Sequence, residues 1–189
     1  MIRVVHFIHG LNMGGAETLV KDYAVLLDKS KFHVTVLCYE RFDSPYETIL
    51  QQNNIPVVYL CDEMPFYGKT GLIAKLVNRF QRYWLVRREL QQLDPDIVHF
   101  HLSLSDYVRF SGLKKSVKLF YTQHFSAEVW KSENSSDIQN LKWLMKHYQV
   151  QPIALNASMC DSMNKILQTD STKILNNGVD LSEYSRLYD

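Results

Sequence analysis

The stretch that most constrains the fold of this chain is its beginning, where an apolar run, a glycine-rich loop and an amphipathic segment follow one another. Residues 2–8 are almost wholly apolar, which is typical of a strand covered on both faces of a parallel sheet. Three glycines follow, and apolar residues then recur at helical spacing over residues 16–27. A strand, a glycine loop and a helix in this order predict the first unit of a doubly wound α/β fold.

The glycine loop is a candidate ligand site, because a helix N-terminus offers free N–H groups and the positive end of a dipole to an anion. The spacing G-x-x-x-G-G differs from both the dinucleotide fingerprint and the P-loop, so the glycines could also serve only to shape a tight turn. We favour the ligand-facing interpretation because the turn opens a helix directly after the first strand. The candidate substrate- or phosphate-binding residues here are Asn12, Gly14, Gly15 and Glu17.

Length and composition limit the class of protein. A chain of 189 residues with 46% hydrophobic residues fits one domain or one large lobe, and a net charge of +1 gives no reason to expect nucleic acid as a partner. The three cysteines are odd in number and widely spaced, which predicts a reducing compartment and no zinc site. The apolar runs are too short for a membrane span, and the first strand leaves no room for a signal peptide, so a cytoplasmic location is expected.

Predicted strands and helices alternate along the chain. After residues 2–8, strands are expected over residues 32–39, 56–60, 96–101, 117–124, 152–155 and 173–175. Besides the helix after the glycine loop, helices are expected over residues 46–52, 72–93, 106–115, 141–148 and 159–167, and a loop over 132–137. This alternation predicts a mostly parallel, Rossmann-like sheet with helices on both faces. With the usual strand order 3-2-1-4-5, ligands are expected beyond the carboxyl ends, between the first and fourth strands.

Three histidines fall at predicted carboxyl ends of strands: His9, His101 and His124. Imidazole can hydrogen-bond a sugar hydroxyl or move a proton near neutral pH, so together with the glycine loop these residues predict a functional crevice. We take His124 as the catalytic candidate, because its strand ends there and a polar loop follows. His101 is a further candidate for binding substrate.

The remaining histidines of these strands are interpreted as structural. His99 lies two residues before His101, so the two share a face of the strand and His99 lies deeper. His6 and His33 fall within strands and are assigned to the fold. A metal site from His99 and His101 is not expected, because no carboxylate or cysteine is placed to complete it.

A basic, aromatic-rich segment covers residues 65–88, where six basic residues occur without an acidic one up to Arg88. Such a helix can rest on an anionic membrane surface or hold an anionic acceptor. The alternative is a solvated basic face above a buried stripe. We expect burial for the apolar stripe and leave both interpretations of the basic face open. The basic residues are Lys69, Lys75, Arg79, Arg82, Arg87 and Arg88, and the expected stripe is Leu72, Leu76, Phe80, Trp84 and Leu90.

Four segments, in order along the chain, resemble motifs of family-four retaining glycosyltransferases, which have the GT-B fold. Residues 14–17 resemble the family's GGAE signature, and residues 96–101 its D-x-V-H-x-H fourth strand. Residues 121–124 are similar to its T-x-H end of the fifth strand. Residues 173–180 are similar to its K-x-x-x-x-N-G-V-D segment, with Asn176 where proline is usual.

This resemblance implies one lobe of a two-lobed GT-B enzyme that moves a sugar from a nucleotide-sugar donor to an acceptor with retention of configuration. In that family the N-terminal lobe mainly binds the acceptor, and the C-terminal lobe binds the donor with a Glu-x7-Glu motif. We therefore expect residues 1–180 to form the N-terminal lobe and residues 181–189 to begin the connection to a missing C-terminal lobe. The fragment alone is expected to be inactive.

Carried over to this sequence, the resemblance places Gly14 and Gly15 against the donor diphosphate or the acceptor, and His124 against the transferred sugar. It implies no catalytic nucleophile in this lobe, no metal and no other cofactor. The expected acceptor is a saccharide or a lipid-linked saccharide, as in the biosynthesis of bacterial surface polysaccharide. Contact of residues 69–88 with the inner membrane face would make the cytoplasmic protein peripheral.

Two other functions are compatible with the same sequence. The first is a dinucleotide-binding lobe of an NAD-type oxidoreductase, in which Glu40 near the end of the second strand would hold a ribose hydroxyl. The second is a non-catalytic module that binds saccharide or docks on a membrane. Hydrolysis is disfavoured because no serine lies in the G-x-S-x-G elbow of hydrolases.

Overall fold

The computed structural model describes residues 1–126, 129–130 and 135–178. One sheet runs through them in the order β3-β2-β1-β4-β5-β6-β7, and every neighbouring pair is parallel. Its strands are β1 (Ile2–Ile8), β2 (Phe32–Cys38), β3 (Val57–Tyr59), β4 (Ile97–His101), β5 (Lys118–Thr122), β6 (Gln151–Ala154) and β7 (Lys173–Ile174). The predicted order 3-2-1-4-5 is confirmed, and so is the reversal of strand order between β1 and β4.

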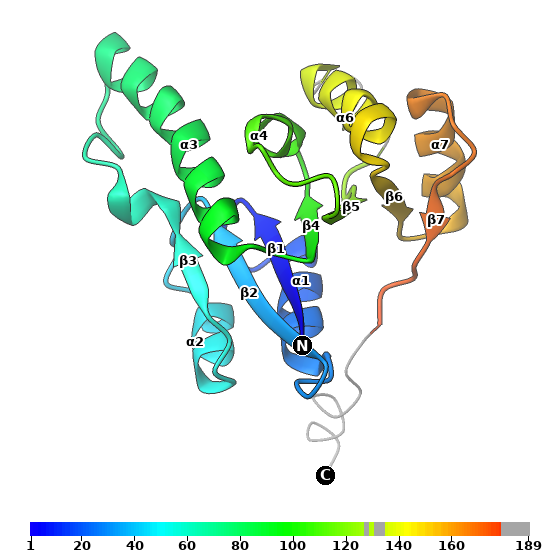
Figure 1. Ribbon diagram of the computed structural model, residues 1–189, viewed down its shortest axis with the longest axis horizontal. Coiled ribbons are helices and arrows are strands. Elements are labelled where there is room, and N and C mark those ends of the chain that lie inside the picture. The colour runs from blue at the N-terminus through cyan, green and yellow to red at the C-terminus, as the bar shows by residue number, and fades with distance from the viewer. Residues whose placement is uncertain (127–128, 131–134, 179–189) are drawn as a thin grey trace.

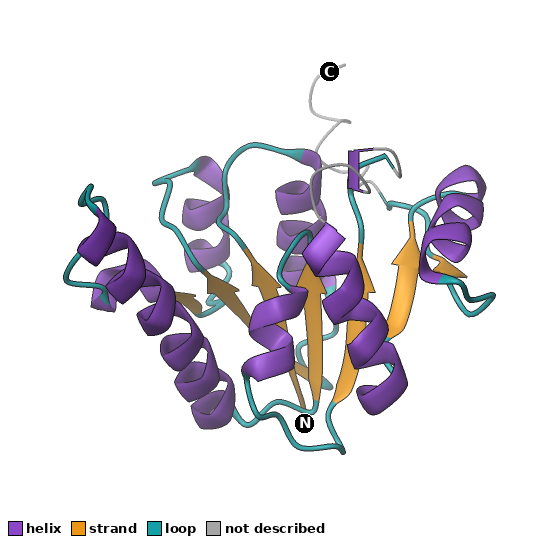
Figure 2. Cartoon of the chain, turned by 90° about the horizontal axis from the view of Figure 1, so that it is seen from above, coloured by secondary structure: helices purple, strands orange, loops and turns teal. Residues whose placement is uncertain are grey.

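Helices cover both faces of the sheet (Figures 1 and 2). The helices α3, α4 and α6 lie on one face, and α1 and α2 lie on the other. Their bounds are α1 (Gly15–Leu26), α2 (Pro45–Gln52), α3 (Leu72–Leu93), α4 (Ser105–Phe110), α6 (Ser135–Tyr148) and α7 (Ala157–Leu167), with a short 3₁₀ turn η1 (Leu60–Glu63). Among the described residues, no helix is long and apolar enough to cross a membrane.

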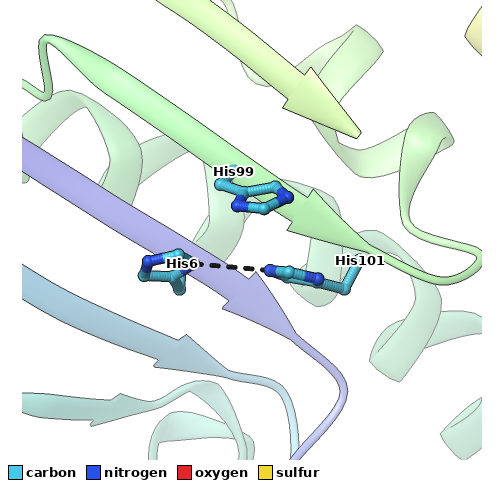
Figure 3. Close-up of side chains that lie close together, drawn as sticks. All are labelled: His6, His99 and His101. Atoms are coloured by element: carbon cyan, nitrogen blue, oxygen red, sulfur yellow. Dashed lines mark hydrogen bonds between the residues drawn. The ribbon is translucent and has the colours of Figure 1, made fainter. Parts of the chain in front are cut away.

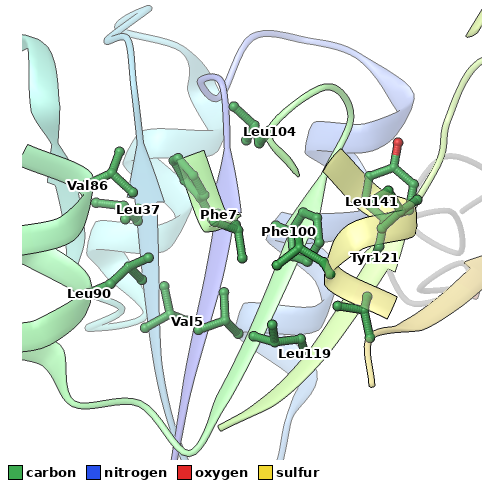
Figure 4. Close-up of a cluster of buried hydrophobic side chains, with 14 of the residues drawn as sticks. Val5, Phe7, Leu37, Val86, Leu90, Phe100, Leu104, Leu119, Tyr121 and Leu141 are labelled. Carbon is green, nitrogen blue, oxygen red and sulfur yellow. The ribbon is translucent and has the colours of Figure 1, made fainter. Parts of the chain in front are cut away.

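The sheet separates two hydrophobic cores, because successive side chains of a strand point to opposite faces. In β1, Val5 and Phe7 face the larger core under α3, α4 and α6, whereas Val4 and Ile8 face the core under α1 and α2. Figure 4 shows the larger core, where Phe7 and Phe100 of the central strands lie between side chains of the covering helices. Burying each of these side chains contributes about 1.5–3 kcal/mol, so the centre of the sheet is the best-anchored part of the fold.

Several element bounds differ from those predicted. The helix expected over residues 106–115 ends at Phe110, because Gly112 takes a left-handed φ of 69°, which a continuing helix cannot accommodate. Helix α6 begins at Ser135, so the loop expected over 132–137 is wrong for its last three residues. Residues 132–134 of that loop lie outside the described part.

The expected buried stripe of α3 is wrong for four of its five residues. Leu72, Leu76, Phe80 and Trp84 are exposed, and only Leu90 is buried. The helix carries apolar residues on two sides, and it packs on the sheet through the side that holds Leu85, Val86 and Leu90. Figure 1 shows why the outer part stays uncovered: the N-terminal half of α3 extends past the ends of the strands.

Candidate functional site

The glycine loop lies at the carboxyl end of β1, where the predicted fold places a ligand. Gly14 is the N-cap of α1 in an extended conformation, and Gly15 is its first residue. A Cβ added at Gly15 would meet nothing within 4 Å, so the space in front of this part of the helix end is open. The free N–H groups of the first turn can therefore meet a ligand there.

Asn12 and Glu17, the other two candidates of this loop, have local contacts. The Asn12 Oδ1 accepts a hydrogen bond from the Met13 backbone N–H at 2.8 Å, which stabilises the turn. The Glu17 carboxylate lies against Gly14, where a Cβ would collide with it. Because this carboxylate already faces the positive end of the helix dipole, an anionic ligand would have to displace it or bind beside it.

A row of histidines crosses the reversal point on the face that carries α1, where Tyr23 lies beside the rings of His6 and His99. Figure 3 shows His6, His99 and His101 of this group. His101 at the end of β4 is fully buried, and its Nδ1 lies 3.1 Å from Nε2 of His124. Its Nε2 lies 3.4 Å from Nδ1 of His6 in β1. His99 bonds through Nε2 to the Thr122 hydroxyl at 2.7 Å. Of the chain His6–His101–His124, only His124 is partly exposed, so it alone can touch a ligand directly.

Burial keeps these histidines neutral at physiological pH. It lowers the pKa of His6 and of His124 to about 4, and it lowers the pKa of His99 and His101 as well. A neutral imidazole carries one N–H, so each contact in the chain needs a donor nitrogen facing a bare one. The tautomer of His124 is therefore tied to the tautomers of His101 and His6.

The same nitrogen atoms form a group that could in principle surround a metal ion. One ring nitrogen from each of His6, His99 and His101 lies within 4.8 Å of the others. Within the described residues no carboxylate or thiolate joins the group, so a divalent cation would sit buried without a counter-charge. Two of the three rings already meet each other through the contact between His6 and His101, and we therefore interpret the group as a hydrogen-bonded cluster.

His9 does not join this cluster, although all three strand-end histidines were expected in one crevice. By the alternation along β1, His9 points to the opposite face of the sheet from His6. There its ring lies 6.2 Å from the ring of Tyr39. Burial lowers the pKa of His9, and the charge of Arg82 lowers it further, whereas those of Glu40 and Asp106 raise it. The sequence thus identified the correct edge of the sheet but not the two separate faces.

A pocket of about 660 Å³ lies on the His9 side, between the loop after β2, the outer half of α3 and the start of α4. The sequence did not predict this pocket, although the cluster of basic residues in segment 65–88 indicated that an anion could bind in this part of the chain. The pocket is lined by Glu40, Tyr67, Gly68, Lys69, Lys75, Asn78, Arg79, Arg82, Tyr83, Asp106 and Tyr107.

The backbone is strained where the chain leaves β4. Leu102, directly after His101, has a φ of 58°, in the left-handed region that a bulky side chain rarely adopts. Its N–H donates to the Thr122 carbonyl at 3.2 Å, which ties the ends of β4 and β5 together. Such strain persists only where the surroundings enforce it, and it occurs preferentially at functional sites.

Comparison with known proteins agrees with this architecture. Residues 13–183 match the family described as Glycosyltransferase Family 4. No curated protein matches the sequence.

Among solved structures, Anabaena HepE in complex with UDP and glucose is similar at 18% identity, with a TM-score of 0.68 over 97% of this chain and 46% of that chain. Its complex with UDP-glucose gives a TM-score of 0.70 at 17% identity. The apo form of the lipopolysaccharide outer core galactosyltransferase WaaB gives 0.63 at 14% identity, over 95% of this chain and 47% of that chain.

At these identities the structural likeness shows a shared fold, and the chain spans about half the length of the proteins that it resembles. The family match covers most of the 189 residues and includes Gly14, Gly15, Glu17, His101 and His124. This chain belongs to Glycosyltransferase Family 4.

Proposed function

We propose that this chain is the acceptor-binding lobe of a glycosyltransferase that moves a sugar from a nucleotide-sugar donor to a saccharide or lipid-linked acceptor, with retention. The observation that carries the proposal is the family match over residues 13–183. The structures of HepE with UDP and glucose, and of the galactosyltransferase WaaB, support the reaction class and a hexose as the transferred sugar. The donor would bind mainly to a second lobe, so the chain alone is expected to be inactive.

In this proposal His124 orients the transferred sugar from the carboxyl edge of the sheet. It is partly exposed, neutral and held by His101, so it can exchange a hydrogen bond with a sugar hydroxyl without a charge of its own. The open helix end at Gly15 would face a phosphate of the donor or the acceptor. Positioning and charge stabilisation would supply the rate, and no metal or other cofactor is proposed.

The test is a His124→Ala substitution in a protein that joins this chain to a donor-binding lobe of the same family. We expect kcat for sugar transfer to fall by roughly 10²-fold, the scale of a lost transition-state contact, with an unchanged melting temperature. The control is His33→Ala, which removes an exposed histidine at the start of β2. Unchanged turnover in a folded His124→Ala protein would show that His124 does not contribute to sugar transfer.

The family match favours glycosyl transfer over the NAD-type oxidoreductase lobe. Glu40 faces the basic pocket beside His9, and the dinucleotide fingerprint is missing from the glycine loop. A flat titration of the chain with NADH would agree with this choice. A non-catalytic saccharide-binding module would be supported only if the two-lobed protein transfers no sugar from any donor tested.

We also propose that α3 holds a cytoplasmic protein against an anionic membrane. The outward side of the helix carries an apolar strip, defined by Ile73, Leu76, Val77, Phe80 and Trp84, which lines a groove on the surface. Phe80 and Trp84 are 74% and 58% exposed. The positive charge of residues 69–88 attracts anionic headgroups at long range, although Lys75, Arg79 and Arg82 lie on the side of the helix opposite to the strip. An aromatic strip of this kind suits the boundary of a bilayer.

Vesicle binding tests this contact. We expect the chain to sediment with vesicles of phosphatidylglycerol and phosphatidylcholine and to be released by salt. The double substitution Phe80→Ser and Trp84→Ser should weaken binding by roughly 10-fold or more, since it removes two aromatic side chains. Leu26→Ser on α1 is the matched control, because Leu26 is an exposed apolar residue on the opposite face. Equal binding by the double variant would contradict membrane contact through α3.

A further inference from the structure

The pocket beside His9 is built for a ligand with more than one negative charge. Four cationic side chains line it, namely Lys69, Lys75, Arg79 and Arg82, against the two carboxylates of Glu40 and Asp106. Within the described part of the chain, none of the four cations forms a salt bridge. Among the described residues, the lining of the pocket therefore carries two more positive than negative charges, and its concave walls concentrate this field.

One carboxylate and one guanidinium of the pocket differ in how completely the protein satisfies their hydrogen bonds. Asp106 is already engaged, because its Oδ2 accepts the Tyr83 hydroxyl at 2.7 Å and its Oδ1 accepts the Tyr107 backbone N–H at 2.8 Å. Arg82 is incompletely engaged: its guanidinium stacks 4.3 Å from the centre of the Tyr39 ring, and its buried Nε has no hydrogen-bond partner among the described residues. A buried donor of this kind favours a ligand that supplies an acceptor.

The pocket has two ends of different chemistry. At its inner end, Glu40 lies beside His9 at the edge of the sheet, because its backbone N–H donates to the His9 carbonyl at 2.7 Å. At its outer end, Lys75 and Arg79 lie one to two helical turns earlier in α3, and Lys69 lies in the loop before the helix. That loop is fixed to the helix, because Asn78 Nδ2 donates to the Phe66 carbonyl at 2.8 Å. The walls between the two ends carry Tyr67, Tyr83 and Tyr107.

We propose that this pocket binds a phosphate or diphosphate group that the acceptor saccharide carries, with the anion at Lys75 and Arg79 and the saccharide toward His9. A carboxylate would need one guanidinium, whereas several separate cations match the spread charge and the many acceptor oxygens of a diphosphate. A volume of about 660 Å³ leaves room for a sugar beside that group, and the tyrosines offer flat faces and hydroxyls to it. This inference rests on the proposed function, because it names the class of its acceptor.

The pocket is separate from the apolar strip of α3. At 100° per residue, Lys75, Asn78, Arg79 and Arg82 lie on the side of the helix opposite to the strip. The strip faces outward, and the pocket faces the carboxyl edge of the sheet. Substitutions on one side should therefore leave the ligand of the other side unaffected.

Calorimetric titration of the chain with inorganic pyrophosphate tests the proposal. A second titration, with sodium chloride at matched ionic strength, is the reference. We expect saturable binding at one site. Lys75→Gln and Arg79→Gln should each weaken it by about 10-fold, the value of one lost charge-assisted contact. Arg87→Gln is the matched control, because Arg87 is an exposed arginine of the same helix outside the pocket. Thermal unfolding of each variant verifies that it is folded.

Two further arms identify the source of the anion. Farnesyl diphosphate represents a lipid-linked acceptor, and UDP represents the donor. Binding of pyrophosphate and farnesyl diphosphate that is lost in Lys75→Gln and Arg79→Gln supports an acceptor pocket. The proposal is overturned by an absence of saturable pyrophosphate binding, by equal effects in Arg87→Gln, or by tighter binding of UDP than of farnesyl diphosphate.

The result of the pyrophosphate titration does not depend on catalysis. Pyrophosphate binding by this chain needs no donor lobe. If the chain does not bind pyrophosphate but a two-lobed protein transfers sugar, the proposed glycosyl transfer is supported and the pocket proposal is wrong. In an active two-lobed protein, Lys75→Gln and Arg79→Gln should raise KM for a diphosphate-linked acceptor by about 10-fold and leave KM for the donor unchanged. If instead no sugar is transferred from any donor while pyrophosphate binds, the function fails and the pocket remains.

Discussion

At the scale of single residues, the histidine chain makes stability depend on pH. The pKa of His6 falls from its ordinary 6.5 to about 4 in the fold, because burial disfavours the charged imidazole. Between these two values the unfolded chain binds a proton that the folded chain does not, so stability is lost as pH falls through this window.

We therefore expect the free energy of unfolding to drop by about 1–2 kcal/mol from pH 7 to pH 5 through His6 alone. Urea unfolding at the two pH values measures the change. His6→Gln, which keeps hydrogen-bonding capacity without titrating in this range, should show a drop smaller by that amount. An unchanged pH dependence in His6→Gln would show that His6 does not carry this linkage.

The sequence could place these side chains on a face of a strand but could not pair the strands. Alternation along β4 correctly set His99 and His101 on one face, and His99 is buried as expected. His6 was missed as a member of the cluster because its neighbourhood depends on the register of β1 against β4, which pairs His6 with His99. No pattern within either segment encodes that register.

At the scale of elements, α3 combines two halves with different energetics. Leu90 in the inner half is fully buried in the larger core, whereas Phe80 in the outer half is 74% exposed. We expect Leu90→Ala to lower the free energy of unfolding by about 2–5 kcal/mol, because it leaves a cavity in the core. Phe80→Ala should change it by no more than about 0.5 kcal/mol. Urea unfolding of both variants tests this contrast, and equal losses would contradict it.

The sequence predicted the bounds of α3 correctly but not the side on which it packs. Helical periodicity shows that a stripe exists, and this helix has apolar residues on two sides, so periodicity alone could not choose between them. The side that packs on the sheet also includes Asn78 and Glu89, both buried, which weakens its apolar signal. Contact with the strands determines which side of α3 packs on the sheet, and only the folded chain shows that contact.

At the scale of the whole molecule, the fold was predictable because every level of the sequence agreed on it. Seven apolar strand-length runs separated by helical segments leave the parallel, doubly wound sheet as the simplest solution. The edge of the sheet that bears Gly14, Gly15 and His124 follows from strand direction alone. The basic pocket did not follow, because it combines the loop after β2, α3 and α4, whose relative placement depends on packing.

The exposed outer half of α3 has a consequence for how such a protein can change over evolution. The side chains of its apolar strip contact solvent rather than the core, so replacing them carries little risk for folding, whereas the inner half and the central strands tolerate far less. Mutations can therefore accumulate on one end of a single helix while the sheet beneath it stays the same. Related proteins could adapt this end to new membranes or new acceptors without rebuilding the scaffold.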